Sequence, residues 1–272
     1  MLGKSLLVIN KEFDHIVIGA GIVGISLGLA ILERNPNKKV LIIDKEPEPG
    51  IHASGRNSGV LHAGFYYSPN SLKAKFCRLG NMELKNFCKE NEIPILETGK
   101  VVVCQTKSDV TRLEELYRRG IANGVYIEIL DSSNLDKIEP AAKTIDKFIW
   151  SPTTAVGNPK AVITKLAEKF VKNGGHFQFN SSVKLVSTKD EVLIETIDGT
   201  YSAVSIVNSA GGQYILYGKD SLSNHCEMGV VGTAILAKAE LATPFVTFVV
   251  RVKLLTAYGD VSSMQLLPAI SI

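Results

Sequence analysis

Residues 14–24, DHIVIGAGIVG, lie near the start of a chain of 272 residues and carry the clearest structural pattern in it. Residues 14–18 form an apolar run that predicts a buried strand, and a glycine-rich turn follows at once. The apolar pattern of residues 22–34 predicts a helix, and residues 39–43 predict a second buried strand that ends before Asp44. A strand, a glycine-rich turn, a helix and a strand in this order predict a βαβ unit with parallel strands.

The three glycines of this turn have the spacing of a dinucleotide-binding site. Gly19 allows the tight turn, Gly21 lets a pyrophosphate approach the backbone, and Gly24 lets the helix pack against the strand. The positive end of the helix then favours a bound diphosphate. Asp44 follows Gly24 by 20 residues, where a carboxylate can bind an adenosine ribose. The alternative is tight helix–strand packing with Asp44 on the surface.

The composition is that of a globular protein with one large domain or two modest ones. Hydrophobic residues make up 45% and charged residues 21%, which argues against a disordered, fibrous or coiled-coil chain. The formal net charge is +3, and basic residues alternate with acidic ones, which argues against nucleic-acid binding. The four cysteines lie outside any CxxC pair, which disfavours a zinc site or a disulfide framework.

The rest of the chain alternates between strand and helix patterns after a loop rich in glycine and proline at residues 45–70. The predicted helices are 71–91, 108–122 and 159–173, and the predicted strands are 99–104, 125–130, 176–179, 183–187, 191–196 and 201–207. The Asp198-Gly199 pair predicts a hairpin between the last two strands. Residues 229–272 contain five charged residues and give no clear periodicity.

Two further segments are candidates for a site. The polar, glycine-rich loop from His52 to Gly64 is either a solvated surface loop or a segment that runs along a cofactor. The strand that ends in Val207-Asn-Ser-Ala-Gly-Gly212 has small residues that allow another group to approach the backbone, or it simply turns into a loop.

Taken together, these motifs resemble a known family. The segments DHIVIGAGIVG, LIIDKEPEPG, HASGRNSGVLHAGFYYSPNSLKAKFCRLGN, Pro94 to Pro140 and NSAGG are similar to the FAD-dependent, D-amino-acid-oxidase-like superfamily. Within it, the long segment after His52 is most similar to L-2-hydroxyglutarate dehydrogenases and oxidases. The resemblance covers residues 13–215, and beyond about residue 215 the chain departs from the family pattern, as a truncated or diverged chain would.

The resemblance implies an α/β fold: a three-layer, Rossmann-like FAD-binding domain with a parallel sheet and an inserted α+β substrate domain. The FAD-binding domain is expected to comprise residues 1–80 and 151–215, and the substrate domain residues 81–150 and 216–272.

The resemblance also implies a set of cofactor-binding residues and one catalytic residue, with no metal ligand. The residues expected to bind FAD are Gly19, Ala20, Gly21, Ile22, Val23, Gly24, Asp44, Lys45, Ser54, Gly55, Asn57, Ser58, Val183, Ala210 and Gly211. His62 is the candidate base, because a neutral imidazole accepts protons near neutral pH; a structural histidine bonded to the backbone is the alternative. For Arg56 the options are anion binding or surface charge, and for Tyr66 and Tyr67 the pocket or the core.

The expected reaction is oxidation of a 2-hydroxy acid, namely L-2-hydroxyglutarate, to the 2-oxo acid by hydride transfer to flavin N5. Arg or Lys side chains would bind the carboxylates. The alternatives are an FAD-binding fragment without turnover, or another superfamily member such as a glycine or amino-acid oxidase or a glycerol-3-phosphate dehydrogenase. An NAD-dependent dehydrogenase fits the glycine turn and Asp44 but leaves the loop from His52 to Gly64 without a role.

The expected partners are the small hydroxy acid and an electron acceptor, either oxygen or a quinone-linked carrier. The expected location is cytoplasmic, with peripheral association at the inner membrane as an option, or mitochondrial in a eukaryote. The segment most like a membrane span is Met228–Val250, but Lys238 and Glu240 near its middle argue against insertion.

Overall fold

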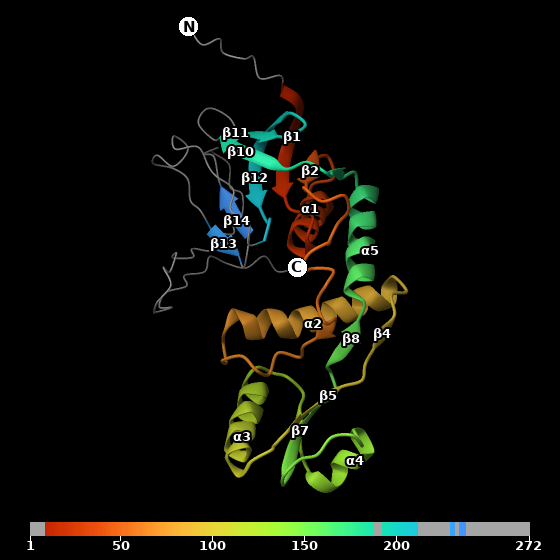
Figure 1. The fold of residues 1–272 in the computed structure, drawn as a ribbon, viewed down its shortest axis with the longest axis vertical. Coiled ribbons are helices and arrows are strands. Elements are labelled where there is room, and N and C mark those ends of the chain that lie inside the picture. The colour runs from red at the N-terminus through yellow and green to blue at the C-terminus, as the bar shows by residue number, and fades with distance from the viewer. Residues whose placement is uncertain (1–8, 188–191, 212–228, 232–233, 238–272) are drawn as a thin grey trace. The chain divides into compact units, whose positions relative to one another are not determined.

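The structure is a computed structural model that describes residues 9–187, 192–211, 229–231 and 234–237 (Figure 1). The chain divides into two compact units. The first comprises residues Met1–Arg56 and Ile163–Ile272, and the second comprises Asn57–Val162.

The first unit contains the predicted βαβ arrangement. Strand β1 (Ile9–Ile18) leads into helix α1 (Ile22–Arg34), which returns to strand β2 (Val40–Ile43), and β2 runs parallel to β1. The sheet continues with β9 (His176–Gln178), also parallel, beyond β2. On the other side of β1 lies β12 (Thr200–Asn208), again parallel to it. Four parallel strands in the order β12-β1-β2-β9 therefore form the centre of the sheet.

Helices α1 and α5 (Pro159–Lys172) cover one face of this sheet. The buried residues of α1 recur at helical spacing, from Gly24 to Leu32, and pack with Ile163 and Phe170 of α5. Gly28 allows this close packing, because a Cβ at this position would lie 2.9 Å from the ring of Phe170. The opposite face buries a second cluster of side chains from β1, β2 and the antiparallel strands described next.

The antiparallel strands extend the sheet beyond β12. Strand β11 (Val192–Thr196) pairs with β12 through the Asp198-Gly199 turn, which confirms the hairpin prediction, and β10 (Val183–Ser187) pairs with β11. Strands β13 (Gly229–Val231) and β14 (Ala234–Ala237) form a further hairpin, and β14 pairs with the end of β12. The sheet is therefore mixed, with a parallel centre as predicted and antiparallel strands at one side.

The second unit is built around helix α2 (Leu72–Glu90), helix α3 (Lys107–Ala122) and two three-stranded antiparallel sheets. Strands β5 (Lys100–Val103), β6 (Glu128–Asp131) and β7 (Lys147–Ser151) form one sheet, with β7 central, and share a buried core with α3. The other sheet joins β3 (Val60–Leu61), β8 (Ala155–Gly157) and β4 (Ile95–Leu96). A short 3-10 turn (Ser132–Asn134) and helix α4 (Leu135–Ile138) link β6 to β7.

The limits of the units differ from the predicted domain limits of 80/81 and 150/151. A limit after residue 80 would cut α2, whose Asn81 donates hydrogen bonds to Leu61 O (2.7 Å) and Thr153 O (3.1 Å). Lys85, one turn later, donates to the same Thr153 carbonyl at 2.6 Å. These contacts hold α2 and the loop between β7 and β8 in one unit. The identity of this unit as a substrate domain stays a prediction.

Residues 216–272, which are expected to belong to the substrate domain, lie largely outside the described residues. The part that is described, β13 and β14, adds to the sheet of the first unit instead. The candidate membrane segment Met228–Val250 also lies outside the described residues, apart from these two strands. Among the helices of the described ranges, none is both long and apolar enough to cross a membrane.

Candidate functional site

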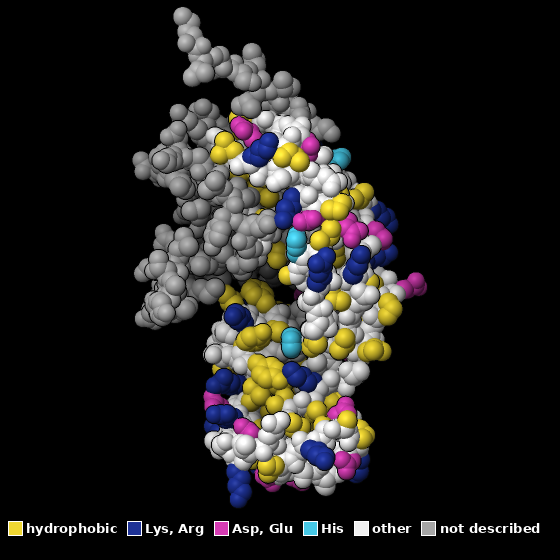
Figure 2. Space-filling view, in the orientation of Figure 1, with side chains coloured by type: hydrophobic (Ala, Val, Ile, Leu, Met, Phe, Trp, Pro, Cys, Tyr) yellow, Lys and Arg dark blue, Asp and Glu magenta, His cyan; other side chains and the backbone are white. Residues whose placement is uncertain are grey.

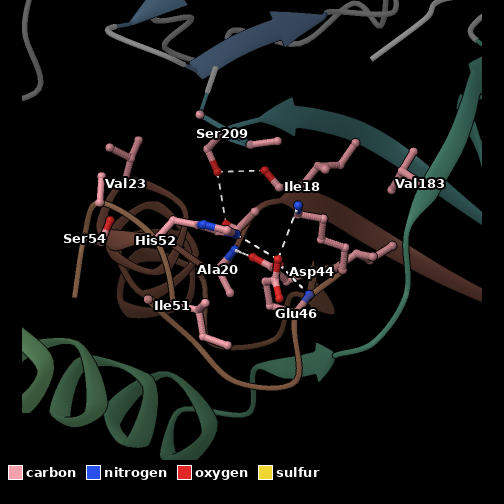
Figure 3. Close-up of a pocket in the computed structure, with 18 of the residues that line it drawn as sticks. Ile18, Ala20, Val23, Asp44, Glu46, Ile51, His52, Ser54, Val183 and Ser209 are labelled. Carbon is pink, nitrogen blue, oxygen red and sulfur yellow. Dashed lines mark hydrogen bonds and ion pairs between the residues drawn. The ribbon is translucent and has the colours of Figure 1, made fainter. Parts of the chain in front are cut away.

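A cavity of about 420 Å³ opens in the first unit where the parallel strands end (Figure 3). Ile18 of β1 is in register with Ile43 of β2 and with Asn208 of β12, so the three strands end at one level. The residues that follow each strand therefore meet at the carboxyl edge of the sheet, the usual ligand site of open α/β sheets. The residues lining the cavity are Ile18, Gly19, Ala20, Gly21, Val23, Ile43, Asp44, Lys45, Glu46, Gly50, Ile51, His52, Ala53, Ser54, Ser181, Ser182, Val183, Ser209, Ala210 and Gly211.

The turn between β1 and α1 fits only glycine at two positions. Gly19 has a φ of +104°, and a Cβ there would lie 2.7 Å from the carbonyl oxygen of Ser209. A Cβ on Gly24 would overlap the carbonyl oxygen of Gly19 and come within 2.6 Å of Ser209 Oγ. The glycines thus let the start of α1 lie against the ends of both β1 and β12.

The start of α1 faces the cavity, and a side chain from the loop that follows β2 accepts one of its backbone hydrogen bonds. Gly21 is the N-cap residue and offers no side chain, so Ser54 Oγ accepts a hydrogen bond from the backbone N–H of Ile22 at 3.0 Å. A Cβ on Gly21 would lie 3.0 Å from that hydroxyl oxygen. Because the first turn of α1 contains no acidic residue, its positive end is available to a bound anion.

The carboxylate of Asp44 holds the turn in place. Its Oδ2 accepts a hydrogen bond from the N–H of Ala20 at 2.6 Å, and its Oδ1 accepts one from the N–H of Glu46 at 2.9 Å. An ionised carboxylate has about four acceptor positions, so further positions stay open for hydroxyl groups of a ligand. Asp44 therefore both shapes the cavity and offers acceptors to it.

Glu46 and His52 form a polar pair at the same cavity, which the sequence did not single out. His52 Nε2 donates to Glu46 Oε1 at 2.8 Å, and Lys45 Nζ lies 3.3 Å from the same oxygen. The hydrogen bond from His52, followed by that from Lys45, lowers the pKa of the Glu46 carboxyl. Both residues lie within the sequence segments quoted above for the family resemblance. Their position in the loop that follows a strand at the carboxyl edge of the sheet is the signal that could have identified them as site residues.

Two serines from distant parts of the chain complete the wall of the cavity. Ser209 Oγ donates to Ile18 O at 2.8 Å, with Gly19 O at 3.1 Å, and so ties β12 to the glycine turn. Ser181 is 1% exposed, and its hydroxyl has no hydrogen-bond partner among the described residues. Buried hydroxyl groups are nearly always hydrogen-bonded, so this orphaned group fits a ligand that supplies the missing partner. A dinucleotide, with its many acceptors, is such a ligand.

Most of the residues predicted to bind the cofactor meet at this cavity. Its lining contains Gly19, Ala20, Gly21, Val23, Asp44, Lys45, Ser54, Val183, Ala210 and Gly211. The predicted residues that are not part of its lining are Ile22, Gly24, Gly55, Asn57 and Ser58. Gly24 instead allows the close packing of the turn, and the N–H of Ile22 donates to Ser54 at the helix start. Asn57 Oδ1 accepts a hydrogen bond from the N–H of Gly59 at 2.9 Å within the second unit.

The candidate base, His62, belongs to the second unit and has an exposed side chain. Its backbone carbonyl accepts a hydrogen bond from Cys77 Sγ at 3.5 Å, whereas its ring is not used in that contact. Partial burial, followed by the positive charge of Lys100, lowers the pKa of the imidazole below its ordinary value. This shift favours the neutral form of the ring, which is the form that can accept a proton. Across the described residues, no group of three His, Cys, Asp or Glu side chains is placed to hold a metal ion.

Comparison with known proteins points to one family. The sequence pattern of the family described as FAD dependent oxidoreductase matches residues 14–241. An L-2-hydroxyglutarate dehydrogenase from Indibacter alkaliphilus is 42% identical over 202 residues, which is 74% of this chain and 50% of that protein. The human mitochondrial L-2-hydroxyglutarate dehydrogenase is 32% identical over 212 residues, or 78% of this chain and 46% of that protein. The chain thus spans about half the length of these relatives.

Solved structures share the fold. Glycine oxidase from Geobacillus kaustophilus superposes with a TM-score of 0.67 at 17% identity and covers 84% of this chain and 71% of that one. An L-alpha-glycerophosphate oxidase from Mycoplasma pneumoniae with FAD bound has a TM-score of 0.65 at 23% identity, covering 72% and 53%. These structural matches confirm the α/β fold class predicted from the sequence, and the matching family pattern confirms the family resemblance.

Proposed function

Because the chain belongs to the family of FAD dependent oxidoreductases, we propose that it binds FAD in the cavity of its first unit and oxidises L-2-hydroxyglutarate to 2-oxoglutarate. The observation that carries the proposal is the geometry at the carboxyl edge of the sheet. There a turn that only glycine fits, the start of a helix without acidic side chains in its first turn and the carboxylate of Asp44 line one cavity.

The residues present fit FAD. The turn from Gly19 to Gly24 and the start of α1 would hold the pyrophosphate, and Asp44 the adenosine ribose. Ser54 and the backbone of Val183 would hold other parts of the cofactor, and the buried hydroxyl of Ser181 would gain the partner that it lacks. The sequence-based roles of Asn57, Ser58, Ala210 and Gly211 are part of this proposal.

In the proposed reaction the C2–H and O–H bonds of the substrate break and a C=O bond forms. FAD, when bound, supplies the acceptor for the hydride from C2. His62 accepts the hydroxyl proton at its imidazole nitrogen, and its lowered pKa favours the unprotonated ring that this step requires beforehand. The names of the relatives support the substrate, since several L-2-hydroxyglutarate dehydrogenases match most of this chain.

The proposal extends to the electron acceptor and the cellular location. The reduced cofactor would be reoxidised by oxygen or by a quinone-linked carrier, and the protein would act in the cytoplasm, at the inner membrane as a peripheral protein, or in mitochondria. The mitochondrial option is supported by the human relative, whose name describes it as mitochondrial. Oxygen uptake compared with reduction of a soluble quinone tells the acceptors apart.

The test is reconstitution of the purified chain with FAD, followed by anaerobic addition of L-2-hydroxyglutarate. We expect saturable FAD binding, loss of the oxidised-flavin absorbance band, and formation of an equimolar amount of 2-oxoglutarate. The D-enantiomer is the matched control and should leave the band unchanged. Absence of FAD binding would overturn the cofactor assignment, and binding without reduction would overturn the substrate assignment.

A further inference from the structure

A lysine of the second unit contacts an aromatic ring rather than a carboxylate. Lys100, the first residue of β5, places its Nζ 4.6 Å from the centre of the Tyr66 ring. Tyr66 in turn stacks on Phe65, with ring centres 4.2 Å apart, and Phe65 is 1% exposed in the core of this unit. The ammonium group is therefore fixed by a cation–π contact with a ring that rests on the core.

Two other lysines of the same unit, unlike Lys100, are paired with carboxylates. Lys85 forms an ion pair with Glu97 at 3.0 Å, and Lys147 forms one with Glu114, also at 3.0 Å. Over the described ranges, no carboxylate forms an ion pair with Lys100. An ammonium group has three N–H donors. An aromatic ring does not accept hydrogen bonds from them in the way that a carboxylate does, so the donors of Lys100 are available to an anion.

The surroundings of Lys100 also suit a ligand that has both a carboxylate and a hydroxyl group. Burial, and after it the positive charge of Lys100, lowers the pKa of the His62 imidazole. Tyr66 is 37% exposed, so its ring is accessible from solvent as well. Figure 2 shows basic and hydrophobic side chains next to one another on the face of the part that contains α2 and α3 in Figure 1.

We propose that Lys100, positioned by the ring of Tyr66, binds a carboxylate of the substrate and so holds the neighbouring hydroxyl group at His62. The inference rests on the proposed function for the identity of the hydroxy acid, and adds the residue that recognises its charge. A bound carboxylate would also neutralise the ammonium that opposes protonation of His62, which favours proton acceptance once the substrate is in place.

The test measures binding of glutarate, a dicarboxylate that has no hydroxyl group to oxidise, to the full chain. The reporter is the imidazole NMR resonance of His62, assigned by its loss in His62→Gln. We expect a saturable shift in the wild type and a dissociation constant at least about tenfold larger in Lys100→Met, the size typical of a lost hydrogen bond to a charged group. Lys100→Arg should keep most of the affinity, because the charge is retained.

Two further variants separate recognition from folding. Lys147→Met removes a lysine of the same sheet that is already paired, and should leave the dissociation constant unchanged. Tyr66→Leu should weaken binding whereas Tyr66→Phe restores it, since only the ring positions Lys100. An unchanged dissociation constant in a folded Lys100→Met variant, or the absence of a saturable shift in the wild type, overturns the inference.

The outcome is separable from that of the proposed function. If glutarate binding depends on Lys100 but L-2-hydroxyglutarate does not reduce the FAD-loaded chain, the carboxylate site stands and the proposed reaction fails. If the flavin is reduced and Lys100→Met leaves both glutarate binding and the KM unchanged, the reaction stands and the role of Lys100 fails.

Discussion

At the scale of single residues, the site depends on close backbone contacts that one added carbon atom would disrupt. Gly24 contacts the carbonyl of Gly19 and the hydroxyl of Ser209, and Gly19 itself has a positive φ. Asp44 is hydrogen-bonded to the buried Ala20 N–H, so it is part of the turn as well as part of the cavity. Residues expected to bind a ligand thus also stabilise the fold around it.

Gly24→Ala is expected to destabilise the protein by about 1–3 kcal/mol, as overpacking does in a close-packed site, and to weaken FAD binding. Urea-induced unfolding followed by circular dichroism measures the first effect. Gly80→Ala is the matched control, because it adds the same methyl group in helix α2 where nothing lies within 4 Å. That change should be neutral or stabilising by up to about 1 kcal/mol. Equal destabilisation by both changes would contradict the close-contact argument.

His62→Ala is expected to lower kcat by about 10²–10⁴-fold, the usual contribution of a general base, with FAD still bound. Steady-state turnover and flavin fluorescence measure the two quantities on one sample. His176→Gln, an exposed histidine on β9, serves as the control and should keep full activity. Unchanged turnover in His62→Ala would remove His62 from the mechanism.

His15 gives the stability of the first unit a predictable pH dependence. Burial is the largest influence on this ring and lowers its pKa below the ordinary value of 6.5. The unfolded chain therefore binds more protons than the folded one near and below pH 6.5, so the free energy of unfolding falls as the pH decreases through that range. His15→Gln should flatten this part of the profile, measured by urea unfolding between pH 7.5 and 5. A slope equal to that of the wild type would show that His15 is not its source.

At the scale of elements, local sequence patterns predicted most helices and strands of the first unit closely, but β1 begins at Ile9 rather than at residue 14. Helix α1 occupies the predicted residues 22–34, and the Asp198-Gly199 turn joins β11 and β12 as predicted. The sequence patterns do not predict β7 and β8, because their short apolar segments lack the alternation or length that identifies a strand. The patterns also do not predict β13 and β14, because the hydrophobic residues around them show no clear periodicity.

Helix α2 supports a prediction at this scale. The Oγ of Ser71, its N-cap residue, accepts a hydrogen bond from the N–H of Ala74 at 3.2 Å. Ser71→Ala is therefore expected to cost about 1 kcal/mol in the free energy of unfolding. Ser68→Ala is the control, because Ser68 contacts the same turn only through its backbone carbonyl, which accepts from the N–H of Ser71. A loss of the same size in both variants would argue against a capping role.

At the scale of the whole molecule, the cavity is lined by residues of the first unit alone, whereas the candidate base and Lys100 lie in the second. The chain that forms the first unit leaves it after Arg56 and returns at Ile163. Binding of the adenosine and pyrophosphate parts of the cofactor is thus expected to depend on the first unit, and recognition of the hydroxy acid on the second.

Addition of FAD is expected to raise the thermal midpoint of the protein in a saturable way. At a free FAD concentration about a hundredfold above the dissociation constant, the free energy of unfolding of the binding unit should rise by about 2.7 kcal/mol. Differential scanning fluorimetry with an extrinsic dye, or circular dichroism, measures the midpoint. NAD shares the adenosine diphosphate part and is the control; a shift of equal size with NAD would favour a nicotinamide-dependent enzyme instead.

The βαβ unit, its glycine turn and the hairpin follow from local sequence patterns, because each depends on residues that are close together in the chain. A periodic apolar pattern or a two-residue turn is complete within about 30 residues and needs no distant partner. That Ser181 and Ser209 share a cavity with Gly19, and that Lys100 lies over Tyr66, is visible only in the folded chain. These contacts depend on strand order, register and packing between distant segments, which no local pattern specifies.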